Sequence, residues 1–258
     1  AASDVYKRQG MNDVLKSNEG IHLLLPANLE FTLEFSGTLP NENKPVVVPD
    51  NIPLAFVGNP TNGNLKMERL QEAMGDGLRG VACWNPKTIQ YDIYTKGAST
   101  NGLNGLLQPT RVCSFHTTGS SFDMTLNLSD LVANGEPFVD ASAPEFLVAA
   151  TVSNANGLSD EAKIVLTEDA QDELQLYDDA KNVTSSGNVD IYWTNADDAA
   201  GASGWAIPRL RLDENPMLAY DLVIKSINPI VTSFSVDFTE VNLGCLLYTS
   251  PSPRDTMS

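Results

Sequence analysis

The sequence is poor in basic residues and in histidine. Its 258 residues include 16 Lys or Arg against 33 Asp or Glu, for a formal charge of −17, and only two histidines. Nucleic-acid-binding surfaces are basic patches or stripes, so this balance argues against a nucleic-acid partner. His22 and His116 have no partner at H-E-x-x-H or H-x₃₋₅-H spacing, which argues against a histidine-based zinc site.

Long apolar runs and nucleophile motifs are also missing. No run approaches the ~20 apolar residues of a membrane helix, so we expect no membrane insertion. The G-x-S-x-G signature of serine hydrolases does not occur. Hydrophobic residues still make up 42% of the chain, which is enough for a buried core and argues against wholesale disorder.

Cysteine is scarce, with three in the chain. Cys83 and Cys113 each lie in a predicted strand, whereas Cys245 lies in the C-terminal segment 245–258. Cys83 and Cys113 can pair if the protein is exported to an oxidising compartment. Buried free thiols fit equally well, because the sequence does not fix the distance between the two residues.

The two ends of the chain differ from the rest. Residues 1–9 (AASDVYKRQ) and 245–255 (CLLYTSPSPRD) match translations of DNA strings that look like the transposase adapters of short-read library preparation. Matches at both ends, in adapter orientation, predict that 1–9 and 245–258 are adapter-derived scars. We expect the protein itself to span 10–244, as an internal fragment of a longer reading frame.

Short runs of alternating apolar and polar residues dominate the remaining sequence. Residues 29–35 (LEFTLEF) alternate cleanly, and clusters of Gly, Asn, Pro and Asp separate such runs. This pattern predicts an all-β fold, an antiparallel β-sandwich of the jelly-roll-like kind with one or two short helices. Further strands are expected at 46–48, 53–58, 80–84, 89–95, 111–117, 121–128, 145–153, 162–167, 188–193, 204–212, 219–227 and 231–241.

The polar stretch 134–144 is the best candidate for a boundary inside the chain. It separates an N-terminal β-sandwich domain or half, 10–136, from a C-terminal one, 137–244. Two separate domains and two halves of one large sandwich both fit this division.

Residues 64–74 form the clearest helix candidate. Leu70 lies on its apolar face, Asn64 is the candidate N-cap, and Gly75 lies just past its end. A shorter turn is expected within 172–182.

The segment 75–80 matches G-x-G-x-x-G to the letter. That motif binds a dinucleotide only where a strand leads into it and a helix leaves it. Here a predicted helix precedes the motif and a predicted strand follows, so we interpret it as a glycine-rich turn.

Aromatic residues make up 7% of the chain, and core packing is our default interpretation of them. Trp84, Trp193 and Trp205 are nevertheless candidate carbohydrate contacts. A carbohydrate platform requires two or three coplanar exposed rings on one sheet face or loop rim.

Acidic pairs recur between residues 160 and 198. Loop carboxylates can supply the oxygens that Ca²⁺ needs, so calcium is the one cofactor kept as an alternative. No D-x-[DN]-x-[DN]-G series occurs, and solvated surface loops are the default interpretation. A hydrolase with two of these carboxylates in a groove is a third hypothesis. The acids concerned are Asp160, Glu161, Glu168, Asp169, Asp172, Glu173, Asp178, Asp179, Asp197 and Asp198.

Six segments carry a family likeness in a consistent order. Residues 54–61 (LAFVGNPT) are similar to a W-N-L-V-G-N-P-Y-P-S segment, and 82–94 (ACWNPKTIQYDIY) to a stretch containing Trp and Tyr, both common in large secreted proteins of Bacteroidota. Thr61 stands where that family usually has Tyr. The other matching segments are 107–115, 159–166, 177–181 and 204–208, so the likeness covers about 29–241.

The resemblance implies a β-sandwich region of the kind found before a type IX secretion sorting domain. It also implies export to the extracellular space or the outer cell surface, and it transfers no catalytic residue. We therefore expect a non-enzymatic module that serves as a stalk, adhesion or matrix-binding segment. Its partner would be a glycan or an extracellular matrix or surface protein. The alternative is a carbohydrate-binding accessory module of a secreted polysaccharide-degrading enzyme.

Overall fold

Strands make up most of the described part of this computed structural model. The described residues are 44–48, 54–85, 90–109, 111–118, 122–140, 143–144, 146–168, 170, 180–181, 189–195, 204–211, 220–226 and 234–241. Helical segments among them are α1 (Met67–Met74) and two 3-10 turns, η1 (Gly75–Gly77) and η2 (Leu128–Asp130). The predicted all-β class is confirmed, while the finer jelly-roll arrangement stays a prediction.

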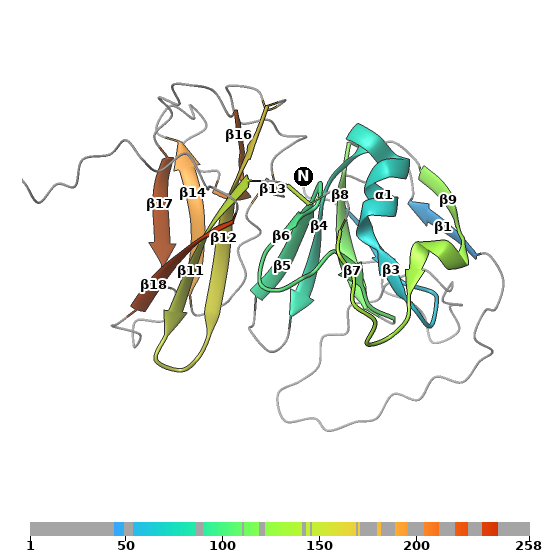
Figure 1. The fold of residues 1–258 in the computed structure, drawn as a ribbon, viewed down its shortest axis with the longest axis horizontal. Coiled ribbons are helices and arrows are strands. Elements are labelled where there is room, and N and C mark those ends of the chain that lie inside the picture. Colours follow the sequence, from blue (N-terminus) through green and yellow to red (C-terminus); the bar gives the residue numbers. More distant parts are fainter. Residues whose placement is uncertain are drawn as a thin grey trace, which may run out of the picture.

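Five antiparallel strands form what we call the central sheet (Figure 1). Its order is β2 (Leu54–Gly58), β8 (Val112–Thr117), β4 (Leu78–Asn85), β5 (Gln90–Thr95) and β6 (Ala98–Ser99). The apolar residues of these strands face both ways, so the sheet contributes to a core on each side.

One face of the central sheet is covered by α1 and by shorter strands. The three-stranded sheet has the order β10 (Leu131–Val132), β3 (Asn64–Lys66) and β7 (Leu106–Leu107), and β1 (Lys44–Val48) pairs with β9 (Phe122–Leu126). The sheet contributes Val81, Tyr94 and Phe115 to this first core, and Leu70 of α1 packs against them. All four side chains are at most 1% exposed.

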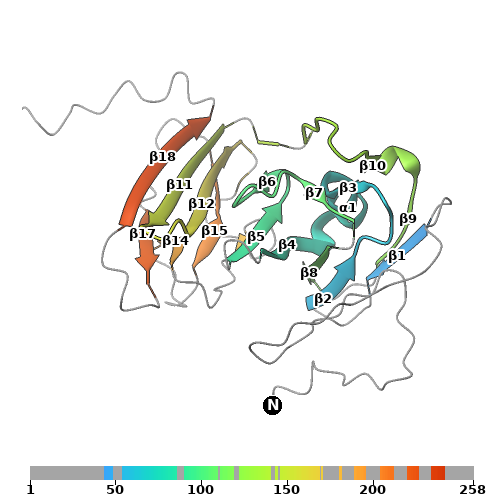
Figure 2. The same ribbon diagram turned by 90° about the horizontal axis from the view of Figure 1, so that it is seen from below.

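Two four-stranded sheets make up the second part of the molecule (Figure 2). The β11 sheet has the order β16 (Arg209–Arg211), β12 (Ser159–Thr167), β11 (Phe146–Asn154) and β18 (Phe234–Val241). The β14 sheet has the order β13 (Ala180–Lys181), β15 (Trp205–Ile207), β14 (Asp190–Asn195) and β17 (Tyr220–Lys225). Their facing side chains, among them Val152, Ala162 and Ile191, form one buried cluster.

A third apolar cluster joins the two parts. Ala82 and Ile93 of the central sheet pack with Val165 of β12 and Ile207 of β15, and all four are at most 4% exposed. The second part therefore covers the β4–β6 side of the central sheet. The predicted boundary at 136/137 falls between β10 and β11, and the division into two domains or two halves stays a prediction.

Hydrogen bonds reinforce this junction. Asn101, which follows β6 with φ of 54°, donates its N–H to Glu161 Oε2 (2.8 Å) and its Nδ2 to Asp160 Oδ1 (3.0 Å). Other donors across the junction are Gln90 Nε2 to the Val189 carbonyl, and Arg209 Nη2 to the carbonyls of Thr95 (3.0 Å) and Lys96 (2.8 Å). Side chains of β12 and β16 and the backbone carbonyl of Val189, just before β14, thus contact the β5–β6 hairpin and its flanking residues.

The predicted helix start was wrong. Asn64–Lys66 is strand β3, paired with β7 and β10, and the helix begins at Met67 after a Lys66 cap that makes no side-chain hydrogen bond. Strand pairing on both sides of β3 outweighs the helical pattern of this short segment. The predicted strand 204–212 is divided at Pro208, which lacks an N–H for a ladder. The predicted strand 29–35 and residues 172–179 of the predicted turn lie outside the described residues.

The glycine motif forms the turn expected of it. Gly75 ends α1 with φ of 52° and ψ of −135°, a conformation that L residues with a Cβ rarely adopt. The turn η1 follows directly and β4 begins at Leu78. The order of elements is helix, turn, strand, opposite to that of a dinucleotide site.

Substituting Gly75 tests this backbone requirement alone, because nothing lies within 4 Å of an added Cβ. We expect Gly75→Ala to lower the free energy of unfolding by about 1–3 kcal/mol, measured by urea denaturation. Gly77→Ala is the matched control, since its φ is not positive and its nearest neighbour is Thr118 Oγ1 at 4.0 Å. Equal losses in the two variants would contradict the assignment.

Candidate functional site

Strand β4 directs Trp84 to the face of the central sheet that lies away from the first core. Val81 and Cys83 belong to that core, so strand alternation turns Ala82 and Trp84 the other way. The indole is 38% exposed. Tyr91 lies opposite Trp84 on β5, and its ring meets the indole edge to face, with centroids 5.2 Å apart and planes at 68°. This contact orients the indole and leaves part of it accessible.

Phe56 on β2 is exposed on the same face of the sheet. It lies opposite Ser114 of β8, which in turn lies opposite Ala82 of β4. The second part buries Ala82, whereas Phe56 is 43% exposed. We call Phe56, Trp84, Ser114 and His116 the open face. Sequence reasoning missed Phe56, although a large apolar residue between the core residues of a strand was the available signal.

The polar members of the open face are uncharged at neutral pH. Ser114 is 6% exposed and its Oγ has no hydrogen-bond partner among the described residues. Burial lowers the pKa of His116, and the nearby Arg79 cation acts in the same direction, so the imidazole is neutral at pH 7. Aromatic rings beside uncharged polar groups suit a neutral ligand with apolar and hydroxyl surfaces.

The other two candidate tryptophans lie in the interior. Trp193 and Trp205 are opposite one another on β14 and β15 and are 7% and 3% exposed. Trp193 shares the face of β14 that carries Ile191 into the core, so its ring packs against the β11 sheet. The expectation that all three tryptophans could contact carbohydrate is therefore corrected. Only Trp84 is placed for such a contact.

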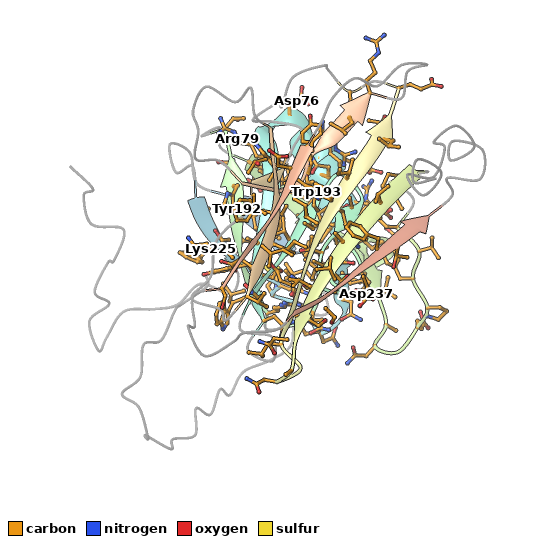
Figure 3. The ribbon with its side chains drawn as sticks, turned by 90° about the vertical axis from the view of Figure 1, so that its left-hand side faces the viewer. Asp76, Arg79, Tyr192, Trp193, Lys225 and Asp237 are labelled. Atoms are coloured by element: carbon orange, nitrogen blue, oxygen red, sulfur yellow. A yellow bond between two sulfur atoms is a disulfide. The ribbon has the colours of Figure 1, made fainter. Side chains whose placement is uncertain are left out.

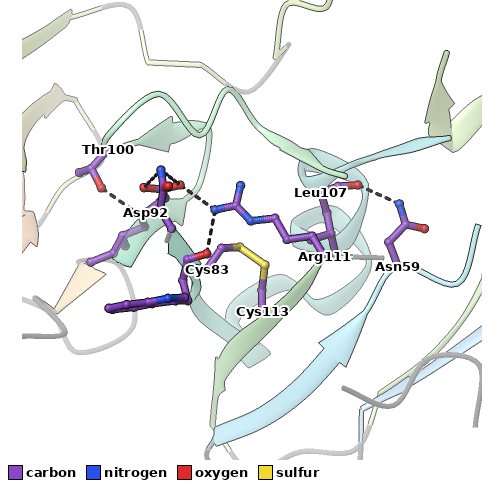
Figure 4. The surroundings of a disulfide bond; sticks show 10 residues. Asn59, Cys83, Asp92, Thr100, Leu107, Arg111 and Cys113 are labelled. Atoms are coloured by element: carbon purple, nitrogen blue, oxygen red, sulfur yellow. Dashed lines mark hydrogen bonds and ion pairs between the residues drawn. A yellow bond between two sulfur atoms is a disulfide. The ribbon is translucent and has the colours of Figure 1, made fainter. Parts of the chain in front are cut away.

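Cys83 and Cys113 form a disulfide between neighbouring strands of the central sheet (Figure 4). The ladder that pairs Ala82 with Ser114 brings the two cysteines opposite each other, with Cα atoms 4.3 Å apart. Both residues are at most 1% exposed. Of the two alternatives left open by the sequence, the structure shows the disulfide.

A buried ion pair lies beside the disulfide (Figure 4). Arg111 Nη2 donates to Asp92 Oδ2 (2.7 Å) and to the Trp84 carbonyl (3.4 Å), and Asn85 Nδ2 donates to both Asp92 oxygens (3.2 Å). Burial raises the pKa of Asp92, although Arg111 and Asn85 act in the opposite direction. This network holds the backbone that presents Trp84.

Asn59 explains the Gly-Asn-Pro-Thr motif in structural terms. Its Nδ2 donates to the carbonyls of Gly63 (2.7 Å) and Leu107 (2.8 Å), and its Oδ1 accepts from the N–H (2.9 Å) and Oγ1 (2.7 Å) of Thr61. The side chain is buried and ties the end of β2 to β7. The motif orders the first part of the molecule.

Asp160 and Glu161 do not lie in a solvated loop, as was expected. Both are on β12, and Asp160 is 6% exposed at the junction. Besides Asn101, Asp160 accepts from the N–H of Ile191 through Oδ2 (2.9 Å), and Glu161 pairs with Lys163 Nζ (3.2 Å). Burial raises the pKa of Asp160 to about 6. These two carboxylates position neighbouring elements.

Of the remaining acidic candidates, the structure describes Glu168. Glu168 is exposed at the end of β12, and the other acidic pairs at 169, 172–173, 178–179 and 197–198 lie outside the described residues. Within the described ranges, no group of three or more His, Cys, Asp or Glu side chains could hold a metal ion. Calcium binding and the two-carboxylate hydrolase stay predictions.

The fold and the open face define an all-β protein with a buried disulfide and one uncovered aromatic surface on its central sheet. Comparisons with protein-family models, with curated proteins and with solved structures found no match for this chain. Among the residues that the structure describes, no helix is long and apolar enough to cross a membrane.

The raised pKa of Asp160 predicts a pH dependence of stability. The pKa of the carboxyl is near its ordinary value of 3.8 in the unfolded state and about 6 in the folded state, so the folded state binds the proton more tightly. The contribution of Asp160 therefore favours folding below about pH 4 and is lost as the pH rises through 6, by about 3 kcal/mol.

Chemical denaturation at pH 4, 5, 6 and 7 measures this loss. Asp160→Asn should flatten the wild-type decline over this range, whereas Glu168→Gln, an exposed control just past the end of the same strand, should leave it unchanged. The same pH profile for Asp160→Asn and the wild type would show that Asp160 does not titrate in this way.

Proposed function

We propose that this chain is a non-catalytic β-sheet module of an exported bacterial surface protein, acting as a stalk, adhesion or matrix-binding segment. It would work at the outer cell surface or in the extracellular space, by surface recognition. The likeness of segments such as 54–61 to secreted Bacteroidota proteins supports this proposal, and type IX secretion is the export route that the likeness implies.

The Cys83–Cys113 disulfide is the observation that carries the proposal. Disulfides form and persist in oxidising compartments and are rare where thioredoxin and glutathione keep thiols reduced. Here the bond joins the two strands at the middle of the central sheet, in a fully buried setting. A structural disulfide in that position favours a protein that folds after export.

The described polar groups favour binding over bond-making. Asp160 accepts hydrogen bonds from Asn101 and Ile191, and Asp92 is paired with Arg111, so these two buried carboxylates serve the structure. The open face offers rings and uncharged polar groups, which recognise a ligand without supplying an acid or base of matched pKa.

Carbohydrate binding is a second candidate function, favoured by the exposure of Trp84. Its indole is oriented by Tyr91, and Phe56 presents a second ring on the same sheet face. Aromatic rings of this kind stack on the apolar faces of sugars, and the neutral, partly exposed His116 beside them can bond a hydroxyl. The ligand would then be a glycan chain laid across β2, β8 and β4.

One binding experiment tests both candidates. The purified, oxidised chain is measured against immobilised glycans and matrix proteins, and in parallel against chromogenic glycoside and ester substrates. We expect saturable binding without turnover. If the ligand is a glycan, Trp84→Ala should weaken binding at least about tenfold, or about 1.4 kcal/mol.

The control for Trp84 is Phe238→Ala, because Phe238 is a more exposed ring on a different sheet, 63% exposed on β18. It should bind glycans as the wild type does. Turnover of any substrate would contradict the non-catalytic proposal, and undiminished glycan binding by Trp84→Ala would rule out the open face as the carbohydrate site.

A further inference from the structure

Strand β17 forms an open edge of the molecule. It pairs with β14 along one side, and no described strand pairs with its other side. In Figure 1 it lies at the outer margin of the second part, away from the central sheet. An edge strand presents a row of backbone N–H and C=O groups that can accept another strand.

The apolar face of β17 is incompletely covered. Leu222 packs against the core between the β11 and β14 sheets, and Ile224 follows on the same face but is 37% exposed. On the neighbouring edge strand β18, Val236 and Phe238 are 36% and 63% exposed. They lie opposite the buried residues Val152 and Ala150, so they too share the face turned to the core. Figure 3 looks onto this side of the molecule.

The charges of β17 are arranged symmetrically about Val223. Asp221 and Lys225 are both exposed and lie two residues to either side of Val223. Alternation places these two side chains on the same face, opposite to that of Leu222 and Ile224. An antiparallel copy of the strand, centred on the same residue, would therefore meet each charge with its opposite.

We propose that β17 pairs with β17 of a second copy of this chain across a two-fold axis, with Val223 opposite Val223. This register places Asp221 opposite Lys225 twice and Leu222 opposite Ile224 twice, all on matching faces. The β14 sheet then continues from one copy into the next, and the exposed part of Ile224 is buried. The interface is isologous and closes after two copies.

The positions of the charges favour this register over other registers of β17, and they favour β17 over β18 as the pairing strand. Centring the pair on Asp221 or on Lys225 would oppose like charges, and centring it on Leu222 or Ile224 would leave no Asp opposite a Lys. Strand β18 carries Asp237 and Glu240 but no basic residue, so its self-pairing cannot match opposite charges. The net charge of −17 repels the two copies at long range, and about 0.15 M salt screens that repulsion beyond about 8 Å.

Sedimentation equilibrium of the full chain at 0.15 M salt tests the proposal, which is independent of the ligand-binding proposal. We expect a concentration-dependent dimer for the wild type. Asp221→Lys alone and Lys225→Asp alone would each oppose like charges twice and should raise the dimer dissociation constant at least about tenfold. The double variant Asp221→Lys/Lys225→Asp restores both pairs at unchanged net charge and should recover the dimer.

Asp123→Lys on β9 is the matched control, because it changes the net charge as Asp221→Lys does at an exposed site of the first part. It should dimerise like the wild type. Circular dichroism checks that each variant is folded. A monomeric wild type, or a dimer unaffected by the single reversals, would overturn the proposal. Failure of the folded double variant to recover the dimer would overturn it too. So would a dimer that is lost in Phe238→Ser but unaffected by either charge reversal, since that result would assign the contact to β18.

Discussion

The alternation of β4, fixed in place by the Cys83–Cys113 disulfide, is the constraint on which the rest of the structure depends. Val81 and Cys83 extend into the first core, and Ala82 extends into the apolar junction with the second part. The disulfide holds β4 to β8 at the centre of the five-stranded order, so a slip of one residue would exchange the two faces. Trp84 lies on the same face of β4 as Ala82, and it remains partly exposed.

Much of the fold could be predicted from the sequence, because strands of five or more residues show their alternation directly. The expected runs at 53–58, 89–95 and 111–117 correspond to β2, β5 and β8 within one or two residues. Strands of two or three residues, such as β3 and β7, are too short for a periodic signal and exist only through their partners. The start of α1 was misplaced for the same reason.

The candidate site was less predictable, since exposure depends on which sheets cover one another. Trp193 and Trp84 both lie on strands, yet Trp193 is buried against the β11 sheet and Trp84 is partly exposed to solvent. In the sequence, Asp160 looked like part of a run of surface acids. In the structure it is buried and accepts hydrogen bonds from Ile191 and Asn101. Whether such a side chain is buried depends on contacts between residues tens of positions apart. The pattern of a single sequence does not show these contacts.

The described part of the chain presents two surfaces of different chemistry. The open face of the central sheet carries aromatic rings and a neutral His116 near the Arg79 cation, whereas the β17 edge combines backbone hydrogen-bonding groups with one acidic and one basic side chain, which suits a strand. A module that uses both surfaces would dimerise through the β17 edge and bind its ligand through the open face. Two linked binding faces raise the effective affinity for a repetitive ligand without any new contact.

The most direct test of the central claim is the state of Cys83 and Cys113 in protein made in an oxidising compartment. Alkylation without reduction, followed by peptide mass spectrometry, should find the two residues linked and neither alkylated. Replacing both by Ser should lower the free energy of unfolding by about 3–4 kcal/mol, given the sequence separation of 30 residues. Alkylated thiols at both positions, together with unchanged stability of the double variant, would contradict a disulfide-locked exported module.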